Sequence, residues 1–343
     1  MADIRFGLVG CGRISKNHIE AIAETEGAVL VAVCDSIKER AEEAGKLAKA
    51  GVYTDYAKML ECKDIDAVSI CTPSGLHPRH GILAARAGKH VVCEKPMGIT
   101  LKDVDEFIDV CDASDVRLFV VKQNRLNATL QLVKKAVDKG RFGRLYMAHA
   151  NVLWTRPQEY YDSAKWRGTW EFDGGAFMNQ ASHYVDALQW LMGPVDSVMA
   201  MTATMARKIE TEDTGSVVMK FRNGAIGSMN VTMLVYPSNM EGSITLIGEK
   251  GTVKVGGVAV NRLEYWKFAD YDDDDGYVKQ CNYTPPNVYG FGHKAYYKNV
   301  VDVLQQRCEP DTDGRSGRKS LELILGIYKS AKEGRRVSLP LDV

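Results

Sequence analysis

The chain has 343 residues, and its 44 basic side chains are balanced by 44 acidic ones. A neutral protein offers no broad positive surface to nucleic acid, so any recognition of an anionic ligand must be local. The sequence contains no apolar run that approaches the roughly twenty residues of a membrane span. The N-terminus runs straight into a predicted strand, which predicts that there is no signal peptide. The length predicts about two domains.

The eight cysteines lie mostly in predicted strands or helices and have no paired metal-ligand spacing. We therefore expect reduced thiols in a cytoplasmic protein, with no bound metal.

The first predicted elements are a strand, a glycine turn and a helix, in the order that a dinucleotide requires. Residues 4–9 form an apolar run of strand length, and residues 15–23 have helical spacing. In the turn between them, Gly10 permits the tight bend and Gly12 has no side chain to block a pyrophosphate. Ser15 stands where the fingerprint has Gly or Ala, and glycine turns also end ordinary strands. At the N-terminus of this helix we expect four cofactor-binding residues: Gly10, Gly12, Arg13 and Ile14.

The second predicted strand, residues 29–34, ends at Asp35. This acid lies about twenty residues beyond the glycine turn, where it would bond the adenosine ribose hydroxyls and repel a 2′-phosphate. The sequence therefore favours NAD over NADP, although Lys38 and Arg40 lie nearby. Asp35 can also cap the predicted helix at residues 36–50, and the two roles are compatible.

Two further strands lead into loops with unusual composition. Residues 67–71 run into Thr72-Pro73-Ser74-Gly75-Leu76-His77, and residues 89–93 run into Glu94-Lys95-Pro96. A helix at residues 101–113 and a strand at residues 117–121 continue the alternation. In a doubly wound sheet the ligand crevice lies at the carboxyl ends of the strands, and both loops emerge there.

These two loops together resemble the glucose-fructose oxidoreductase, inositol dehydrogenase and rhizopine catabolism (Gfo/Idh/MocA) family of NAD(P)-dependent sugar oxidoreductases. The resemblance spans the whole chain. It implies an α/β fold with an N-terminal Rossmann domain at residues 1–122. It also implies a C-terminal α+β domain for substrate binding and oligomerisation at residues 123–343, whose end, residues 336–340, returns to the first domain. The cofactor-binding residues implied beyond the glycine turn are Asp35, Thr72, Pro73, Ser74, Leu76, His77, Glu94, Lys95 and Gln123.

The second half of the chain has a different pattern from the first. A hairpin signal, Asn223-Gly224, joins two strands in a series that continues to residue 268. This series predicts a large, mainly antiparallel open sheet with helices on one face. The acidic run at residues 270–275 has the ligands for a cation, but a solvated loop is the more ordinary state of such a run. The predicted strands are 145–153, 195–205, 216–221, 225–234, 243–247, 252–255 and 263–268, and the predicted helices are 127–139, 290–306 and 319–332.

A second constellation occupies residues 173–183. Asp173 suits a helix N-cap and Gly193-Pro194 ends the pattern, so we predict one helix on which Asn179 and His183 share a face. A lone helical histidine usually packs or faces solvent, but the family resemblance places the catalytic histidine here, with an Asp four residues earlier. This chain has Asn179 at that position. A neutral amide orients a hydroxyl but cannot take its proton, so the acid/base work falls on His183 and Lys95.

Further stretches resemble a subgroup of the family, the bacterial UDP-N-acetylglucosaminuronic acid 3-dehydrogenases. They lie at residues 122–125, 154–161, 166–170, 179–186, 236–237 and 248–251. The resemblance implies NAD-dependent oxidation of the C3 hydroxyl, on the route to diacetamido-mannuronic acid of surface polysaccharide such as O-antigen. It also implies a homotetramer built through the open sheet, whose strands are too apolar to face water.

The diphosphate and carboxylate of such a substrate require cations around the cleft. The loop at residues 156–167 offers positive donors and aromatic surface together. The expected substrate-binding residues are Lys95, Arg125, Tyr161, Lys165, Trp166, Arg167, Asn179, Gln180 and His183.

We expect a neutral His183 to be the base, since imidazole works near pH 7. The ammonium of Lys95 would hold the hydroxyl oxygen and stabilise the alkoxide. The reverse assignment stays open, and Glu94 is expected to orient Lys95 or the cofactor. The alternatives are a dehydrogenase of another sugar or cyclitol, a redox-neutral NAD-dependent glycosidase, and a non-catalytic NAD-binding regulator. Retention of both Lys95 and His183 argues against the regulator, and the sequence leaves open whether NADH is released or reoxidised in place by a 2-oxo acid.

Overall fold

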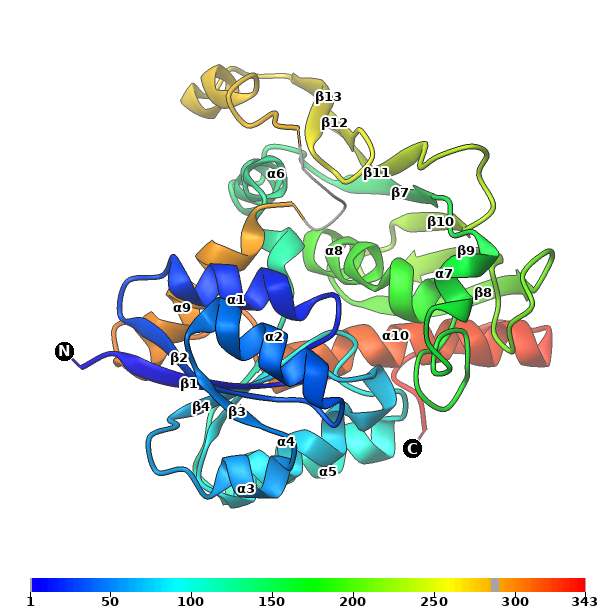
Figure 1. The fold of residues 1–343 in the computed structure, drawn as a ribbon. Coiled ribbons are helices and arrows are strands. Elements are labelled where there is room, and N and C mark those ends of the chain that lie inside the picture. The colour runs from blue at the N-terminus through cyan, green and yellow to red at the C-terminus, as the bar shows by residue number, and fades with distance from the viewer. Residues whose placement is uncertain (1, 285–289, 343) are drawn as a thin grey trace. The chain divides into compact units, whose positions relative to one another are not determined.

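The computed structural model describes residues 2–284 and 290–342. The chain divides into two compact units, the first comprising Met1–Lys122 and His293–Leu321 and the second Gln123–Gly292 and Glu322–Val343. Within the described ranges no helix is long and apolar enough to cross a membrane. Each unit contains one sheet, as the ribbon in Figure 1 shows.

The first unit contains a six-stranded parallel sheet in the order β3-β2-β1-β4-β5-β6. The order reverses beside β1, so the carboxyl ends of β1 and β4 flank the position where doubly wound sheets bind ligands. Helices α1 and α2 lie on one side of this sheet and α4 and α5 on the other (Figure 1). The predicted Rossmann fold is confirmed. The elements are β1 (Ile4–Val9), α1 (Ser15–Ala23), β2 (Ala28–Cys34), α2 (Lys38–Ala48), β3 (Gly51–Tyr53), α3 (Tyr56–Leu60), β4 (Ala67–Ile70), η1 (Ser74–Leu76), α4 (His77–Arg86), β5 (His90–Cys93), α5 (Leu101–Ala113) and β6 (Leu118–Val120).

A late segment of the chain completes the first unit. Helix α9 (Gly292–Leu304) places Tyr297 edge-on to Phe6 of β1, with ring centroids 5.4 Å apart. Thr312 then donates a hydrogen bond to the carbonyl of Val120 at 2.7 Å. The predicted boundary at residue 122 leaves this segment in the second domain, because helical spacing alone does not reveal which sheet a late helix packs against.

The second unit contains an eight-stranded sheet in the order β13-β12-β11-β7-β10-β9-β8-β14. All its strand pairs are antiparallel except β10 with β7, so the predicted mainly antiparallel sheet is confirmed. Gly224 has φ +90° in the turn between β9 and β10, a backbone conformation that favours glycine. The strands are β7 (Leu145–Leu153), β8 (Val195–Ala203), β9 (Thr214–Phe221), β10 (Ile226–Thr232), β11 (Glu241–Gly248), β12 (Gly251–Gly256), β13 (Arg262–Phe268) and β14 (Val337–Ser338).

Helices cover one face of this sheet. Helix α8 packs on β7 and α6 packs on β12 (Figure 1). The opposite face carries four exposed apolar side chains, of which the strand register places Met199 directly opposite Val218: Met199, Met201, Val218 and Ile226, which are 47%, 78%, 54% and 54% exposed. The remaining elements of this unit are η2 (Gln123–Leu126), α6 (Ala128–Asp138), α7 (Gln158–Asp162), the π-helical turn η3 (Ala176–Gln180), α8 (Ser182–Met192) and η4 (Asp273–Tyr277), and α10 (Gly314–Glu333) runs from the first unit into the second.

The end of the chain belongs to the second sheet. Val337 and Ser338 of β14 pair with Val198 and Ser197 of β8. That this end also packs back on the first domain stays a prediction. A two-residue strand at a sheet edge has too little periodicity to be recognised from sequence.

Candidate active site

The glycine turn of the first unit has the geometry of an anion site. Gly10 has φ +90°, and a Cβ there would lie 2.7 Å from the backbone of Cys71 and Thr72, so only glycine fits. A Cβ on Gly12 would meet no atom within 4 Å, so open space lies above the turn. Within the described residues, α1 has no side-chain cap and no acid in its first turn. Its first N–H groups and the positive end of its dipole are therefore suited to a pyrophosphate.

Ser15, the departure from the glycine fingerprint, stabilises this turn. Its buried hydroxyl donates to the carbonyl of Gly12 at 2.6 Å. The neighbouring predicted residues differ in exposure, because Arg13 is exposed and Ile14 is half-buried. A serine at the third position therefore ties the turn to the start of α1 by a bond that glycine or alanine cannot make.

Asp35 connects the end of β2 to the glycine turn. One carboxylate oxygen accepts from the backbone N–H of Cys11 and the other from that of Ile37, both at 2.8 Å. The N-cap of α2 is Ile37, so the predicted capping role of Asp35 is wrong in detail. Burial, and then the Asp35 charge, raise the pKa of the Cys11 thiol to about 12. The cysteine in the turn therefore stays a neutral thiol.

His77 joins the two loops that follow β4 and β5. Its Nδ1 lies 2.7 Å from the carbonyl oxygen of Pro96, and its Nε2 lies 2.7 Å from that of Thr72. Burial lowers the pKa of His77 despite these two carbonyls. A neutral imidazole has one N–H and donates to one of these two carbonyls while its ring lies between both, so this predicted cofactor residue joins the loops. Of its predicted neighbours, Ser74 is buried, and Thr72, Pro73 and Leu76 are half-buried.

A buried hydrogen-bonded chain ends at the backbone of Lys95. The Ser69 hydroxyl lies 2.7 Å from the Tyr297 hydroxyl, which lies 2.6 Å from Nδ1 of His18. His18 Nε2 lies 2.9 Å from Glu94 Oε1, and Glu94 Oε2 accepts from the N–H of Lys95 at 3.0 Å. This backbone contact supports the expectation that Glu94 orients Lys95. His18 and Tyr297 were not predicted from the sequence.

Burial by itself would raise the pKa of Glu94. The hydrogen bond and charge of His18, together with the charge of Lys95, outweigh burial and lower the pKa from 4.5 to about 2. Glu94 is therefore a carboxylate at neutral pH. Ligand-type atoms of His18, Glu94 and His293 lie within 4.8 Å of one another. The 2.9 Å contact between His18 and Glu94 is a direct hydrogen bond, so this group has the geometry of a polar network.

In the second unit, the segment that leads to His183 is not one helix. A π-helical turn, η3, is followed by α8. Asn179 belongs to the turn and His183 to the helix, so the argument from a spacing of four residues does not apply. Asp173 is not an N-cap: it accepts from the N–H of Gly168 at 2.7 Å and from the amide of Asn179. Such π turns often occur at functional sites.

His183 is buried, at 8% exposure. The amide nitrogen of Gln123 lies 3.1 Å from its Nε2. An Nε2 that accepts this bond carries the lone pair that a general base needs. Three residues further along α8, the Asp186 carboxylate accepts hydrogen bonds from Nε and Nη2 of Arg125, both at 2.7 Å. Gln123 and Arg125, which were expected to bind cofactor and substrate, thus both contact α8.

The loop from residue 156 to residue 167 gathers two guanidinium groups around Tyr160. Arg167 donates to the Tyr160 hydroxyl at 2.6 Å and stacks 4.3 Å from its ring. Arg156 lies 5.5 Å from the same ring and donates to Gln180 at 2.8 Å. Gln180 in turn donates to the Tyr160 hydroxyl at 2.9 Å and to Asn179 at 3.1 Å. This cluster is a local positive site with aromatic walls.

The other predicted residues of this loop differ in position. Burial raises the pKa of Tyr161, which is 8% exposed and packs edge-on against Tyr160. Lys165 is exposed, and Trp166 is half-buried with its ring 4.6 Å from the guanidinium of Arg167. Arg156 and Tyr160 lie in the same loop and belong to the cluster, but their sequence pattern does not distinguish them as ligands.

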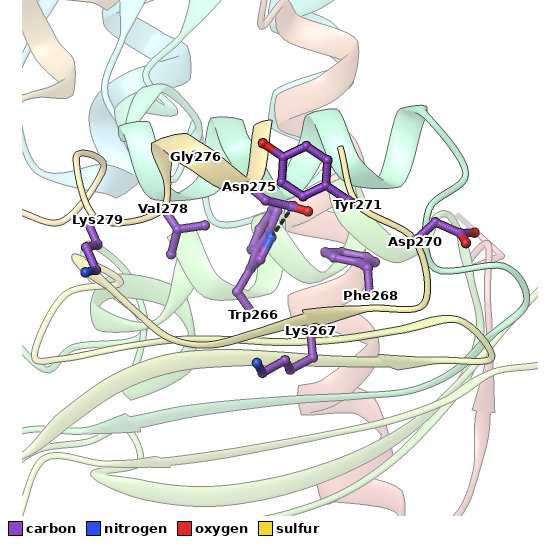
Figure 2. A pocket seen from close by; sticks show the side chains of 9 residues that line it. All are labelled: Trp266, Lys267, Phe268, Asp270, Tyr271, Asp275, Gly276, Val278 and Lys279. Atoms are coloured by element: carbon purple, nitrogen blue, oxygen red, sulfur yellow. Dashed lines mark hydrogen bonds between the residues drawn. The ribbon is translucent and has the colours of Figure 1, made fainter. Parts of the chain in front are cut away.

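Three aspartates of the acidic run at residues 270–275 are paired with basic residues of α6 and the loop after it. Lys139 lies 2.8 Å from Asp272 and 2.7 Å from Asp274, and Arg141 lies 2.7 Å from Asp275. Trp266 also donates to Asp275, as the dashed line in Figure 2 marks. These contacts favour a structural turn over a cation site. The adjoining pocket, about 680 Å³, contains none of the predicted site residues; it is lined by Trp266, Lys267, Phe268, Asp270, Tyr271, Asp275, Gly276, Val278 and Lys279.

Comparison with protein families places both halves of the chain. Residues 4–122 match the NAD-binding Rossmann fold of the Gfo/Idh/MocA oxidoreductase family, and residues 134–339 match the C-terminal alpha/beta domain of the same family. The chain belongs to this family. It is therefore an NAD-dependent oxidoreductase of the sugar dehydrogenase type, as the sequence predicts.

Several solved structures resemble the chain over its full length. The WlbA dehydrogenase from Bordetella pertussis, in complex with NADH and UDP-GlcNAcA, is 59% identical with a TM-score of 0.97, covering 99% of each chain. The WlbA dehydrogenase from Chromobacterium violaceum, in complex with the same two ligands, is 54% identical with a TM-score of 0.95, covering 100% of this chain and 98% of the other. A more distant relative, myo-inositol 2-dehydrogenase from Thermotoga maritima, is 28% identical over 98% of each chain.

Proposed function

We propose that this protein uses NAD to oxidise the C3 hydroxyl of UDP-N-acetylglucosaminuronic acid (UDP-GlcNAcA) to the 3-keto sugar nucleotide. The observation that carries the proposal is the 59% identity, over 99% of both chains, to a WlbA dehydrogenase crystallised with NADH and UDP-GlcNAcA. The Tyr160 cluster adds support, since a neutral protein must concentrate its cations locally to bind a diphosphate and a carboxylate.

The first unit would hold the NAD. Gly10, Gly12 and the N-terminus of α1 would receive the pyrophosphate, because the space above Gly12 is open and the helix N-terminus is free of side-chain caps within the described residues. Asp35 would face the adenosine ribose and disfavour a 2′-phosphate. When bound, NAD supplies a hydride acceptor at C4 of its nicotinamide.

In the proposed reaction the C3–H bond breaks and its electron pair leaves as hydride to the nicotinamide, while the hydroxyl proton moves to Nε2 of His183. The products are the 3-ketone, NADH and an imidazolium. The substrate hydroxyl would replace the amide of Gln123 as the donor to Nε2, which lies 3.1 Å from that amide. The Lys95 ammonium would stabilise the developing alkoxide, and Glu94 would hold the Lys95 backbone.

The substrate anions would be bound by the Tyr160 cluster. Arg156 and Arg167 both stack near the ring of Tyr160, and guanidinium groups pair well with carboxylate and phosphate oxygens. Gln180 and Asn179 extend this cluster toward α8 through their mutual hydrogen bond. The other residues proposed to contact substrate are Lys95, Arg125, Tyr161, Lys165, Trp166 and His183.

We also propose a homotetramer assembled through the open face of the second sheet. Met199 and Val218 pair on that face, Met201 and Ile226 are exposed on the neighbouring positions, and exposed apolar patches usually mark contacts between proteins. We propose that the reaction takes place in the cytoplasm and serves the synthesis of surface polysaccharide such as O-antigen. The eight cysteines, all free thiols, support a reducing compartment.

Product analysis tests this function. Purified enzyme is incubated with NAD and UDP-GlcNAcA, NADH is followed at 340 nm, and the product is trapped with borodeuteride so that NMR locates the deuterium. Deuterium at C3 is the expected result. Deuterium at another carbon would contradict the assignment, and release of free sugar without net NADH would indicate the glycosidase. A parallel reaction with a 2-oxo acid shows whether NADH is reoxidised in place.

A further inference from the structure

Four consecutive backbone N–H groups at the start of the π turn are bonded by two distant residues. Tyr328 of α10 accepts from the N–H of Gly175 at 3.2 Å and from that of Met178 at 3.1 Å. Glu212 accepts from the N–H of Ala176 at 3.1 Å through its carbonyl, and from that of Phe177 at 2.9 Å through Oε1. A helix start has no internal partners for these groups, so the two residues act as its cap.

The cap is tightly built. The Tyr328 hydroxyl accepts two N–H bonds and donates to Glu212 Oε1 at 2.9 Å, which uses its whole hydrogen-bonding capacity. Glu212 is 3% exposed. A Cβ at Gly175 would lie 1.6 Å from Glu212 Oε2, so any larger residue there would expel the glutamate. This close approach explains why position 175, the second of the Gly174-Gly175 pair, is glycine.

The cap is continuous with the proposed catalytic helix. The N–H of Ala181 bonds the carbonyl of Ala176 at 2.9 Å, which closes the π turn on the residue that Glu212 holds. The N–H of Val185 then bonds the carbonyl of Ala181 at 3.1 Å, which begins α8. His183 lies inside this first turn of α8. A shift of the capped segment would therefore be transmitted to the histidine through two consecutive backbone bonds.

We propose that Glu212 and Tyr328 are positioning residues for the oxidation, because they fix the direction from which α8 presents His183. They also set the π turn that carries Asn179 and Gln180. This inference rests on the proposed function, in which His183 takes the substrate proton. It assigns the two residues no contact with substrate or cofactor.

Four variants test the inference. Tyr328→Phe removes only the shared hydroxyl, and Tyr265→Phe, on the exposed surface of β13, is its matched control. Glu212→Ala removes the Oε1 acceptor, whereas Glu212→Gln keeps it. For each variant kcat, KM and NAD affinity are measured well below the melting temperature, with the folded fraction determined by circular dichroism.

We expect Tyr328→Phe and Glu212→Ala to lower kcat of the folded enzyme at least tenfold with little change in NAD affinity. Glu212→Gln should stay within about threefold of the wild type, and Tyr265→Phe should be unchanged. A role in stability alone would lower the melting temperature and leave kcat of the folded enzyme intact. If Tyr328→Phe does not fold, the contrast between Glu212→Ala and Glu212→Gln decides.

An active wild type with kcat within twofold in both Tyr328→Phe and Glu212→Ala would overturn this inference alone. A wild type that cannot reduce NAD with UDP-GlcNAcA would instead overturn the proposed function. The two failures are therefore distinguishable in one set of assays.

Discussion

Glu212 should make the stability of the protein depend on pH in a direction unusual for a carboxylate. Burial raises its pKa, and the N–H of Phe177 and the hydroxyl of Tyr328 only partly oppose this, so the pKa rises from 4.5 to about 7. The difference between the ordinary and the folded-state pKa of Glu212 corresponds to about 3 kcal/mol of folding free energy, since one pKa unit is about 1.4 kcal/mol. The stabilisation from the protonated group is complete below pH 4.5 and is lost as pH rises through about 7.

The comparison of the wild type with Glu212→Gln isolates this contribution, because the amide does not titrate. At pH 5 the two melting temperatures should be similar, and at pH 8.5 the variant should melt about 5 °C higher, at roughly 2 °C per kcal/mol. Asp213 provides a control of opposite sign. Burial by itself would raise the pKa of Asp213. Hydrogen bonds from the N–H groups of Met205, Ala206 and Arg207 outweigh burial, so the pKa of Asp213 lies below its ordinary value. The wild type therefore gains stability from Asp213 as pH rises through the acid range up to the ordinary pKa of 3.8, and Asp213→Asn should lose stability relative to the wild type over that range only, with no further change from pH 5 to 8.5. A difference between wild type and Glu212→Gln that stays constant from pH 5 to 8.5 would refute the reasoning.

Three further predictions concern chemistry and binding. Lys95→Ala and His183→Ala should each lower kcat about a hundredfold or more. Calorimetry should show unchanged NAD affinity for His183→Ala. A nearly active His183→Ala enzyme would move the base role to Lys95. Wild type should bind NAD clearly better than NADP, and Asp35→Ala should lose this discrimination more than maximal rate, so equal calorimetric affinities in the wild type would be evidence against the ribose contact. Arg167→Ala should raise KM for UDP-GlcNAcA about ten- to a hundredfold, since a charge-assisted bond is worth about 1.5–3 kcal/mol, and an unchanged KM would remove Arg167 from the substrate site.

The sequence predicts the first unit well, because its signals are local. Five of its six strands are short apolar runs that the sequence predicts, whereas the three-residue β3 carries too little pattern, and glycine at positions 10 and 12 specifies the turn geometry. The mainly antiparallel second sheet is also predictable, since Asn223-Gly224 and alternating side chains specify hairpins. Local patterns do not show which sheet a late helix or strand packs against, as α9 and β14 illustrate.

The details of the candidate site depend on contacts between residues far apart in the chain. The residues around His18 give no sign that its ring hydrogen-bonds Tyr297, because Tyr297 lies 279 positions further along the chain. The bidentate pair between Arg125 and Asp186 likewise spans 61 positions, and a sequence pattern shows only an arginine suited to a ligand. Helical spacing also fails at Asn179, because a π turn changes the periodicity before α8 begins.

The central claim is that C3 of the sugar is the carbon oxidised. The most direct test is a crystal structure of the enzyme with NAD and UDP-GlcNAcA, obtained with the His183→Ala variant to prevent turnover. The account predicts that C3 lies about 3–3.5 Å from nicotinamide C4, the separation of a reactive pair, with Lys95 Nζ bonded to the C3 hydroxyl. Another ring carbon at that distance, or a sugar bound away from the nicotinamide, would contradict it.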